Sequence, residues 1–61
     1  MIIEHNLKQN EMYLLKEFLE IGELLQIVET ISGNKIAIVE ETDGMIAIVN
    51  LTTGEQTVML N

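Results

Sequence analysis

Few side chains in this 61-residue chain could perform acid–base chemistry or bind a metal ion. His5 is the single imidazole, and there is no cysteine, so the chain has neither a thiolate nucleophile nor a thiolate metal ligand. One histidine cannot supply the ligand set of a zinc site, and nothing near His5 in the sequence suggests a nucleophile that it could activate. We therefore expect His5 to be an exposed residue beside the start of a helix, and we predict no catalytic residue and no enzyme activity.

Carboxylates provide the remaining candidate chemistry. Glu40, Glu41 and Asp43 lie close together in the sequence, around the tip of a predicted hairpin. Their oxygens are the ligand type that Ca²⁺ and Mg²⁺ prefer, but their spacing is not that of an EF-hand loop. Acidic residues are also common in solvated turns, because their side chains accept hydrogen bonds from the backbone of the turn. We therefore predict no metal site and no cofactor, and we expect these carboxylates to face solvent.

The overall charge is strongly negative. Ten acidic residues stand against three lysines, Lys8, Lys16 and Lys35, and arginine is absent, which gives a formal net charge of -7. Nucleic-acid phosphates and anionic membranes repel a chain with this charge, so we predict no direct nucleic-acid binding and no membrane binding. The N-terminal residues lack the basic start and long apolar run of a secretory signal, and no stretch approaches the ~20 apolar residues of a membrane span. We expect a cytoplasmic protein whose partners are basic or neutral proteins.

The elements that would position these residues are clearest in the second half of the chain, where one pattern occurs twice. Residues 36–44 and 46–54 each consist of an apolar run that ends in threonine and glycine. β-Branched residues favour strands, and the glycines provide the left-handed conformation that tight hairpin turns require. We therefore predict an antiparallel meander with strands near 35–41, 45–51 and 56–60.

The first half predicts a helix over about 7–21, because its apolar residues recur at helical spacing. Asn6 followed by Gln9 resembles a capping box, and Asn10 is a second possible N-cap. The acidic residues of this segment are expected to form the solvated side of the helix, together with Lys16. These acidic residues are Glu11, Glu17 and Glu20.

Two structures fit the segment over 23–30. In one, Gly22 ends the helix as a left-handed C-cap, and the β-branched residues that follow form a further strand before a turn at 32–34. In the other, apolar residues spaced four and three apart continue the helix to about Thr30 as a coiled-coil-like arm or dimer stem. Glycine inside a helix costs about 1 kcal/mol relative to alanine, so we favour the strand. The members of the heptad-like series are Leu14, Phe18, Ile21, Leu25 and Val28.

These elements predict a single α+β domain over residues 1–61, with an N-terminal helix followed by an antiparallel β-meander of three to four short strands. Both faces of the meander are apolar, and a single short helix covers only one of them. The sheet is therefore expected either to curl into a small-barrel-like sheet or to pack its second face against another subunit. The layout is similar to that of small SH3-like and Sm-like barrels, but no signature motif accompanies it, and the acidic charge argues against their RNA-binding members.

The hairpin turns decide which residues lie on the second face. With two-residue turns at 43–44 and 53–54, Ile36 and Ile38 face the helix, and a set of four residues faces away from it as a predicted homodimer interface. A three-residue turn with a bulge at Gly44 would instead redistribute the isoleucines between the faces. The candidate interface residues under the two-residue turns are Val39, Ile46, Ile48 and Met59.

Length and composition then leave two main classes of function. A chain of 61 residues without disulfides has a marginal core, and self-association is a common way to bury more surface. We predict a non-enzymatic protein-interaction or regulatory module that forms a homodimer and binds another protein, as an inhibitor, an antitoxin-like neutraliser or an adaptor. The alternative is an acidic DNA-mimicking inhibitor, whose carboxylates would imitate phosphates and block a nucleic-acid-binding protein. The two differ in salt dependence, since a mimic loses its partner as ionic strength rises and an apolar interface does not.

Overall fold

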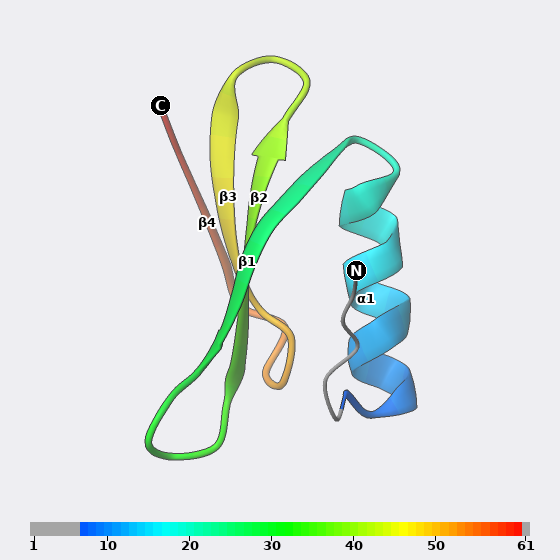
Figure 1. The fold of residues 1–61 in the computed structure, drawn as a ribbon, viewed down its shortest axis with the longest axis vertical. Coiled ribbons are helices and arrows are strands. Elements are labelled where there is room, and N and C mark those ends of the chain that lie inside the picture. Colours follow the sequence, from blue (N-terminus) through cyan, green and yellow to red (C-terminus); the bar gives the residue numbers. More distant parts are fainter. Residues whose placement is uncertain (1–6, 61) are drawn as a thin grey trace.

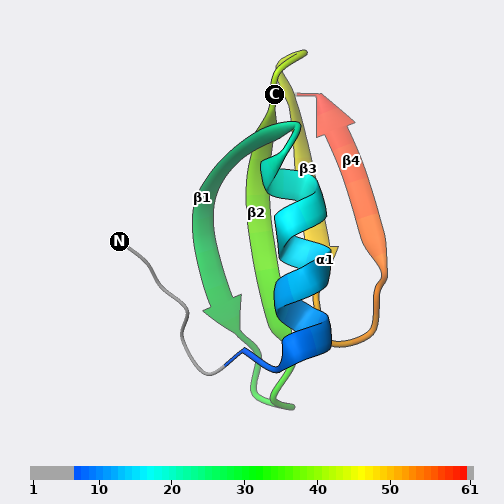
Figure 2. The same cartoon turned by 90° about the vertical axis from the view of Figure 1, so that its right-hand side faces the viewer.

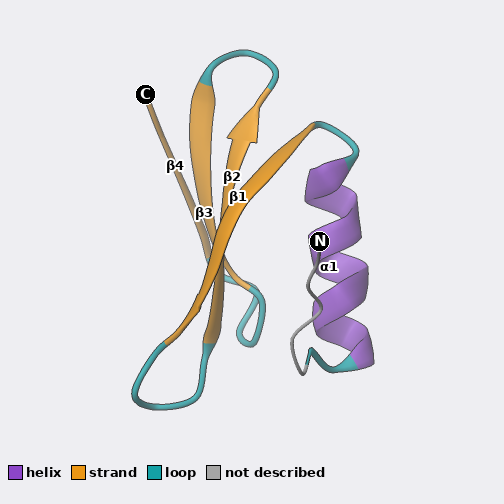
Figure 3. Ribbon diagram, in the orientation of Figure 1, coloured by secondary structure: helices purple, strands orange, loops and turns teal. Residues whose placement is uncertain are grey.

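A computed structural model describes residues 7–60 of the chain. Within this range the chain forms one helix, α1 (Gln9–Leu19), followed by four strands, β1 (Gly22–Glu29), β2 (Lys35–Glu41), β3 (Met45–Asn50) and β4 (Gln56–Leu60). The strands form one antiparallel sheet in sequence order, and the helix lies against one side of it (Figure 1; Figure 3). The predicted α+β fold with a β-meander is confirmed. The sheet is open, with β1 and β4 at its two edges, so it does not take the curled, barrel-like form.

Lys8 directly precedes the first residue of α1, Gln9, and Glu11 stabilises the first turn of the helix. The backbone N–H of Lys8 donates to Glu11 Oε1 at 2.8 Å, and the carbonyl of Lys8 accepts the N–H of Met12 at 2.9 Å. A glutamate three residues after the cap that accepts the cap's own amide is one half of a capping box. The N-cap is therefore Lys8 and not Asn10, whereas the other predicted cap, Asn6, lies outside the described residues.

The segment after the helix is a strand, so the continued helix with a heptad seam is excluded. Gly22 begins β1 with backbone outside the left-handed region, and the predicted left-handed C-cap is therefore wrong. Glycine is needed there for a different reason, because an added Cβ would lie 2.5 Å from the carbonyl oxygen of Glu40 and 2.9 Å from Val39 Cγ1. Farther along, the register with β2 shifts between Leu24 and Gln26, which places a bulge in β1.

The turn between β2 and β3 decides which side chains face the helix. Val39 pairs with Ala47 and Ile38 with Ile48, and the strands are joined by the three residues 42–44. The predicted two-residue turn is therefore wrong. Because a register change of one residue reverses the face of every side chain, the alanine and valine of β2 lie beneath the helix and its isoleucines face away.

The connection between β3 and β4 also differs from the prediction, but the faces are unchanged. Ile48 pairs with Thr57, two residues away from the predicted partner Met59. A shift of two residues preserves the face of each side chain, so Met59 remains on the face away from the helix. Asn50 Oδ1 accepts the backbone N–H of Thr52 at 3.0 Å and stabilises the longer loop.

The core lies between α1 and the middle of the sheet, and Figure 2 shows the helix in front of β2 and β3 with β4 to one side. A helix is about 10 Å wide and neighbouring strands are about 4.8 Å apart, so one helix covers about two strands. β4 consequently lies beyond the cover of the helix, and all five of its residues are exposed. The buried apolar residues are Leu15, Phe18, Ala37, Val39, Ala47, Val49 and Leu51.

Candidate functional site

The face of the sheet that points away from α1 carries apolar side chains that no described element covers. Residues that pair across antiparallel strands share a face and contact one another, so the register places these side chains in adjacent rows. Scattered apolar residues are ordinary on a protein surface, whereas a contiguous group marks an interaction site. We call this surface the open face, and its apolar members are Val28, Ile36, Ile38, Ile46, Ile48 and Met59.

The predicted interface residues divide between the open face and the core. Ile46, Ile48 and Met59 lie on the open face. Val39 is instead 0% exposed beneath α1, because the three-residue turn reverses β2, and its place in the candidate interface is corrected. Had the left-handed glycine at position 44 been taken as the end of a three-residue turn, the pattern would have indicated the right face. The open-face residues that the sequence pattern missed are Val28, Ile36 and Ile38.

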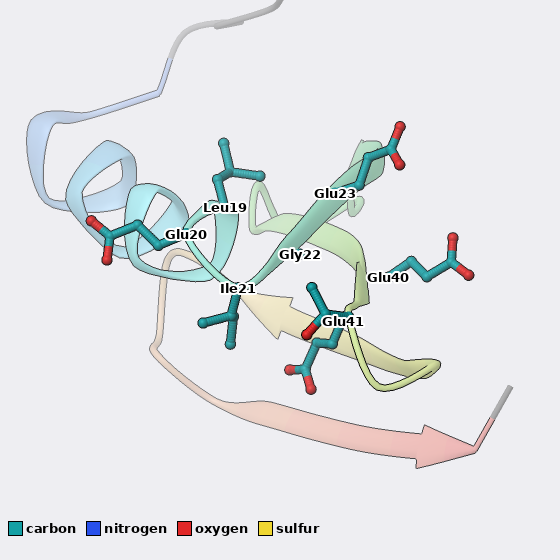
Figure 4. A pocket seen from close by; sticks show the side chains of 8 residues that line it. Leu19, Glu20, Ile21, Gly22, Glu23, Glu40 and Glu41 are labelled. Carbon is teal, nitrogen blue, oxygen red and sulfur yellow. The ribbon is translucent and has the colours of Figure 1, made fainter.

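Two carboxylates border the open face. Glu23 of β1 lies directly opposite Glu40 of β2, and both side chains project from the same face of the sheet (Figure 4). Like charges at directly opposed positions of a sheet repel each other. Within residues 7–60 the one salt bridge joins Lys35 to Glu29, so no cation of the described chain pairs with Glu23 or Glu40. A basic side chain supplied from outside would relieve this repulsion.

The carboxylates near the β2–β3 hairpin do not converge on a common point. A hollow of about 310 Å³ lies where α1, β1 and β2 meet. Figure 4 shows that its four carboxylates do not point toward one another. Glu40 and Glu41 are successive strand residues and therefore project from opposite faces. Asp43 Oδ1 accepts the N–H of Met45 at 3.0 Å, which is the ordinary role of an aspartate in a turn. In the described part of the chain, no group of three or more acidic or histidine side chains is arranged to hold a metal ion.

Glu11 is buried, although the sequence pattern places it on the solvated side of the helix, and that expectation is wrong. Its Oε1 accepts the Lys8 amide, and its Oε2 accepts the hydroxyl of Thr52 at 3.0 Å. The Thr52 oxygen in turn accepts the backbone N–H of Lys35 at 2.9 Å. The Lys8 amide lowers the pKa of Glu11, burial opposes this, and the Thr52 hydroxyl and the charges of Lys35 and Lys8 lower the pKa further. Glu11 thus fastens the start of α1 to the β3–β4 loop and to β2.

A second exposed region lies between the helix and β4. Side chains of α1, of the residues after it and of β4 line a groove of about 300 Å³ at this position. The groove exists because α1 stops short of covering the fourth strand (Figure 2). Its lining residues are Leu14, Glu17, Phe18, Ile21 and Gln56.

His5, the single candidate for general acid–base chemistry, lies outside the described residues. Between residues 7 and 60, no helix has the length and apolar character needed to cross a membrane. No protein-family model, curated protein or solved structure matches the chain.

Proposed function

We propose that the protein is a non-enzymatic interaction module that forms a homodimer, and that its open face binds another protein. The observation that carries this proposal is the group of apolar side chains on the sheet face opposite α1. The single 11-residue helix of the described chain lies on the other face and cannot cover both. Burial of apolar surface on a partner is worth about 25 cal/mol per Å², so an uncovered sheet face favours association.

The chemistry of the open face indicates the kind of partner. Its centre consists of isoleucine side chains, and the Glu23–Glu40 pair lies at one border. A complementary partner presents an apolar surface with a lysine or arginine that reaches the two carboxylates. The net charge of -7 also attracts a basic partner from a distance and speeds the encounter. An inhibitor, an antitoxin-like neutraliser or an adaptor would use such a surface, and the lack of cysteine suits a cytoplasmic location.

The spatial arrangement of the acidic residues favours this proposal over DNA mimicry. A mimic needs its carboxylates along one surface, where they can replace a row of phosphates. Glu40 and Glu41 project from opposite faces of the sheet, and Glu11 is buried in hydrogen bonds of its own chain. The charge is therefore spread around the molecule, whereas six apolar side chains lie in adjacent rows on the open face.

Affinity capture with matched variants tests the proposal. Native protein, an Ile48→Glu variant and a Tyr13→Glu control are each immobilised and incubated with a lysate of the source cell, and captured proteins are quantified by mass spectrometry. Ile48 lies in the middle rows of the open face, whereas Tyr13 is 58% exposed on the helix. We expect Ile48→Glu to reduce capture of the partner at least about tenfold, because an unpaired charge buried in an apolar interface costs several kcal/mol. Equal capture by all three proteins would contradict the proposal.

Ionic strength separates the two kinds of partner. The same capture is repeated at about 0.05 M and about 0.5 M salt, where the range of electrostatic interactions differs several-fold. Capture through the open face should persist at high salt. Capture that disappears at high salt and is insensitive to Ile48→Glu would instead indicate the acidic mimic.

A further inference from the structure

β4 is an edge strand without the features that normally prevent pairing with another chain. All five of its residues are exposed, including Val58 at 46%, Met59 at 48% and Leu60 at 81%. Its sequence has no charge and no proline, and its register with β3 runs without a shift. Figure 2 shows β4 at the border of the sheet, with no described element beyond it. A regular, exposed and apolar edge of this kind pairs readily with another strand.

β1, the other edge, carries two of the protective features that β4 lacks. The bulge between Leu24 and Gln26 interrupts its regular register, and Glu23 and Glu29 lie near its two ends. Antiparallel pairing of two β1 strands about Gln26 would set Glu23 of each copy against Glu29 of the other. Like charges at opposed positions are destabilising, so two copies of this chain are directed away from β1.

The unpaired backbone groups of β4 belong to alternate residues. The N–H of Asn50 donates to the carbonyl of Glu55 at 2.7 Å, so these residues face each other across the β3–β4 connection. Backbone groups alternate in direction along an antiparallel strand, and Thr57 and Met59 therefore also face β3. The residues that direct one N–H and one C=O away from the sheet are Gln56, Val58 and Leu60.

We propose that two copies of the chain pair along β4, antiparallel about a two-fold axis at Val58, and join their four-stranded sheets into one continuous sheet. This pairing names the surface for the self-association in the proposed function and rests on it. The axis sets Val58 against Val58 of the second copy and Gln56 against Leu60. The outward N–H and C=O groups of these residues then lie opposite each other, as the ladder of hydrogen bonds requires. No charged residue of β4 meets a like charge along this ladder.

The two-fold arrangement closes and leaves the open face free. Pairing β4 of one copy with β1 of another would leave an unpaired edge at each end and would continue into a filament, whereas pairing of two β4 strands ends at the dimer. Strand partners share a face, so the two open faces lie side by side on the same side of the joined sheet. Met59 of each copy then lies beside Thr57 of the other. The dimer presents two adjacent copies of the surface proposed to bind another protein.

Val58→Pro tests the pairing, because the N–H at this position points away from the sheet. Proline removes that donor and places its ring against the second copy, while Thr57 and Met59 keep their hydrogen bonds to β3. Val58→Thr is the matched control, since threonine retains the N–H and the β-branched shape. Multi-angle light scattering at about 100 µM detects a dimer with a Kd of about 10 µM. We expect native protein and Val58→Thr at twice the chain mass of 6.9 kDa, and Val58→Pro at the chain mass itself.

Ile48→Glu separates edge pairing from packing of two open faces against each other. We expect this variant to remain a dimer, since Ile48 lies on the open face and outside the β4 ladder. A dimer that survives Val58→Pro and dissociates with Ile48→Glu would overturn the edge pairing and leave the proposed self-association standing. A native monomer would overturn both, and the capture experiment would still decide whether another protein binds the open face.

Amide hydrogen exchange on the native protein gives a measurement that does not depend on the folding of a variant. The outward N–H groups of Gln56, Val58 and Leu60 face solvent in a monomer and are hydrogen-bonded in the dimer. With a Kd of about 10 µM, the monomer fraction falls from about 0.6 at about 5 µM protein to about 0.1 at about 500 µM, so their exchange should slow about sixfold. Thr57 and Met59 bond to β3 in either state and provide the internal control. Rapid exchange of the outward groups at both concentrations would refute the pairing.

Discussion

Replacement of Gly22 by alanine should destabilise the fold through one contact between β1 and β2. The added Cβ would lie 2.5 Å from the carbonyl oxygen of Glu40 and 2.9 Å from Val39 Cγ1. A carbon and an oxygen in contact are about 3.3–3.6 Å apart, so the start of β1 must retreat by roughly 0.8 Å. β2 cannot yield easily, because Val39 is fully buried beneath the helix and β2 is paired on both sides.

The expected loss is a large part of the total stability. Forcing an extra methyl group into a packed site costs about 1–3 kcal/mol. At about 0.05–0.15 kcal/mol per residue, a 61-residue domain has an unfolding free energy of about 3–9 kcal/mol. A loss of about 2 kcal/mol should lower the Tm by about 8–16 °C. Circular dichroism melts of native protein and Gly22→Ala, at equal concentration so that association does not differ, measure this shift.

Gly44 provides a control that distinguishes destabilisation by a steric clash from destabilisation by an unfavourable backbone conformation. Its φ is 87°, and apart from Gly44 itself and its two chain neighbours no residue has an atom within 4 Å of the position that a Cβ would take. Asparagine tolerates left-handed backbone, so Gly44→Asn should cost about 1 kcal/mol or less. At Gly22 the obstacle is space, and Gly22→Asn should be at least as damaging as Gly22→Ala. A Tm of Gly22→Ala within about 2 °C of native, or recovery of stability by Gly22→Asn, would refute the close-contact argument.

Four further outcomes follow from the same structure. Leu51→Ala should cost about 2–5 kcal/mol in urea unfolding, because Leu51 is 2% exposed, whereas the control Ile31→Ala, at a fully exposed site outside both proposed interfaces, should cost less than about 1 kcal/mol. The folded pKa of Glu11 is lowered, so its contribution to stability is present above the unfolded pKa and is lost as the pH falls through the folded pKa. Unfolding free energies between about pH 7 and pH 3 should therefore fall less steeply for Glu11→Gln than for native protein, and equal slopes would contradict this role. Each copy carries a charge of -7, so salt should screen the repulsion between two copies and lower the Kd of the homodimer. Sedimentation equilibrium measures this Kd, and a Kd that rises with salt would show that attraction between opposite charges holds the dimer together. Melting curves with and without a chelator should superimpose, and a fall of several degrees would reveal an ion held by the carboxylates of the β2–β3 hairpin.

Local patterns in the sequence were sufficient to predict the helix, the strands and the places where the chain turns. β-Branched runs favour strands over short distances, and glycine provides left-handed backbone at Gly33, Gly44 and Gly54. These preferences depend on a residue and its immediate neighbours, so no knowledge of distant contacts is needed. Three of the six apolar residues of the open face, Ile46, Ile48 and Met59, were predicted because their strands kept the expected faces.

Tertiary contacts decided which residues are buried. The sequence allows two registers for the β2–β3 hairpin, and each gives both faces of the sheet apolar residues. The observed register places Ala37 and Ala47 beneath α1 beside Val39, and small side chains there let the helix approach the sheet closely. Burial of Glu11 likewise depends on Thr52, 41 positions away along the chain. Hydrophobic pattern specifies that a face is apolar, but the side on which each residue lies depends on how well the helix packs against the sheet in each register.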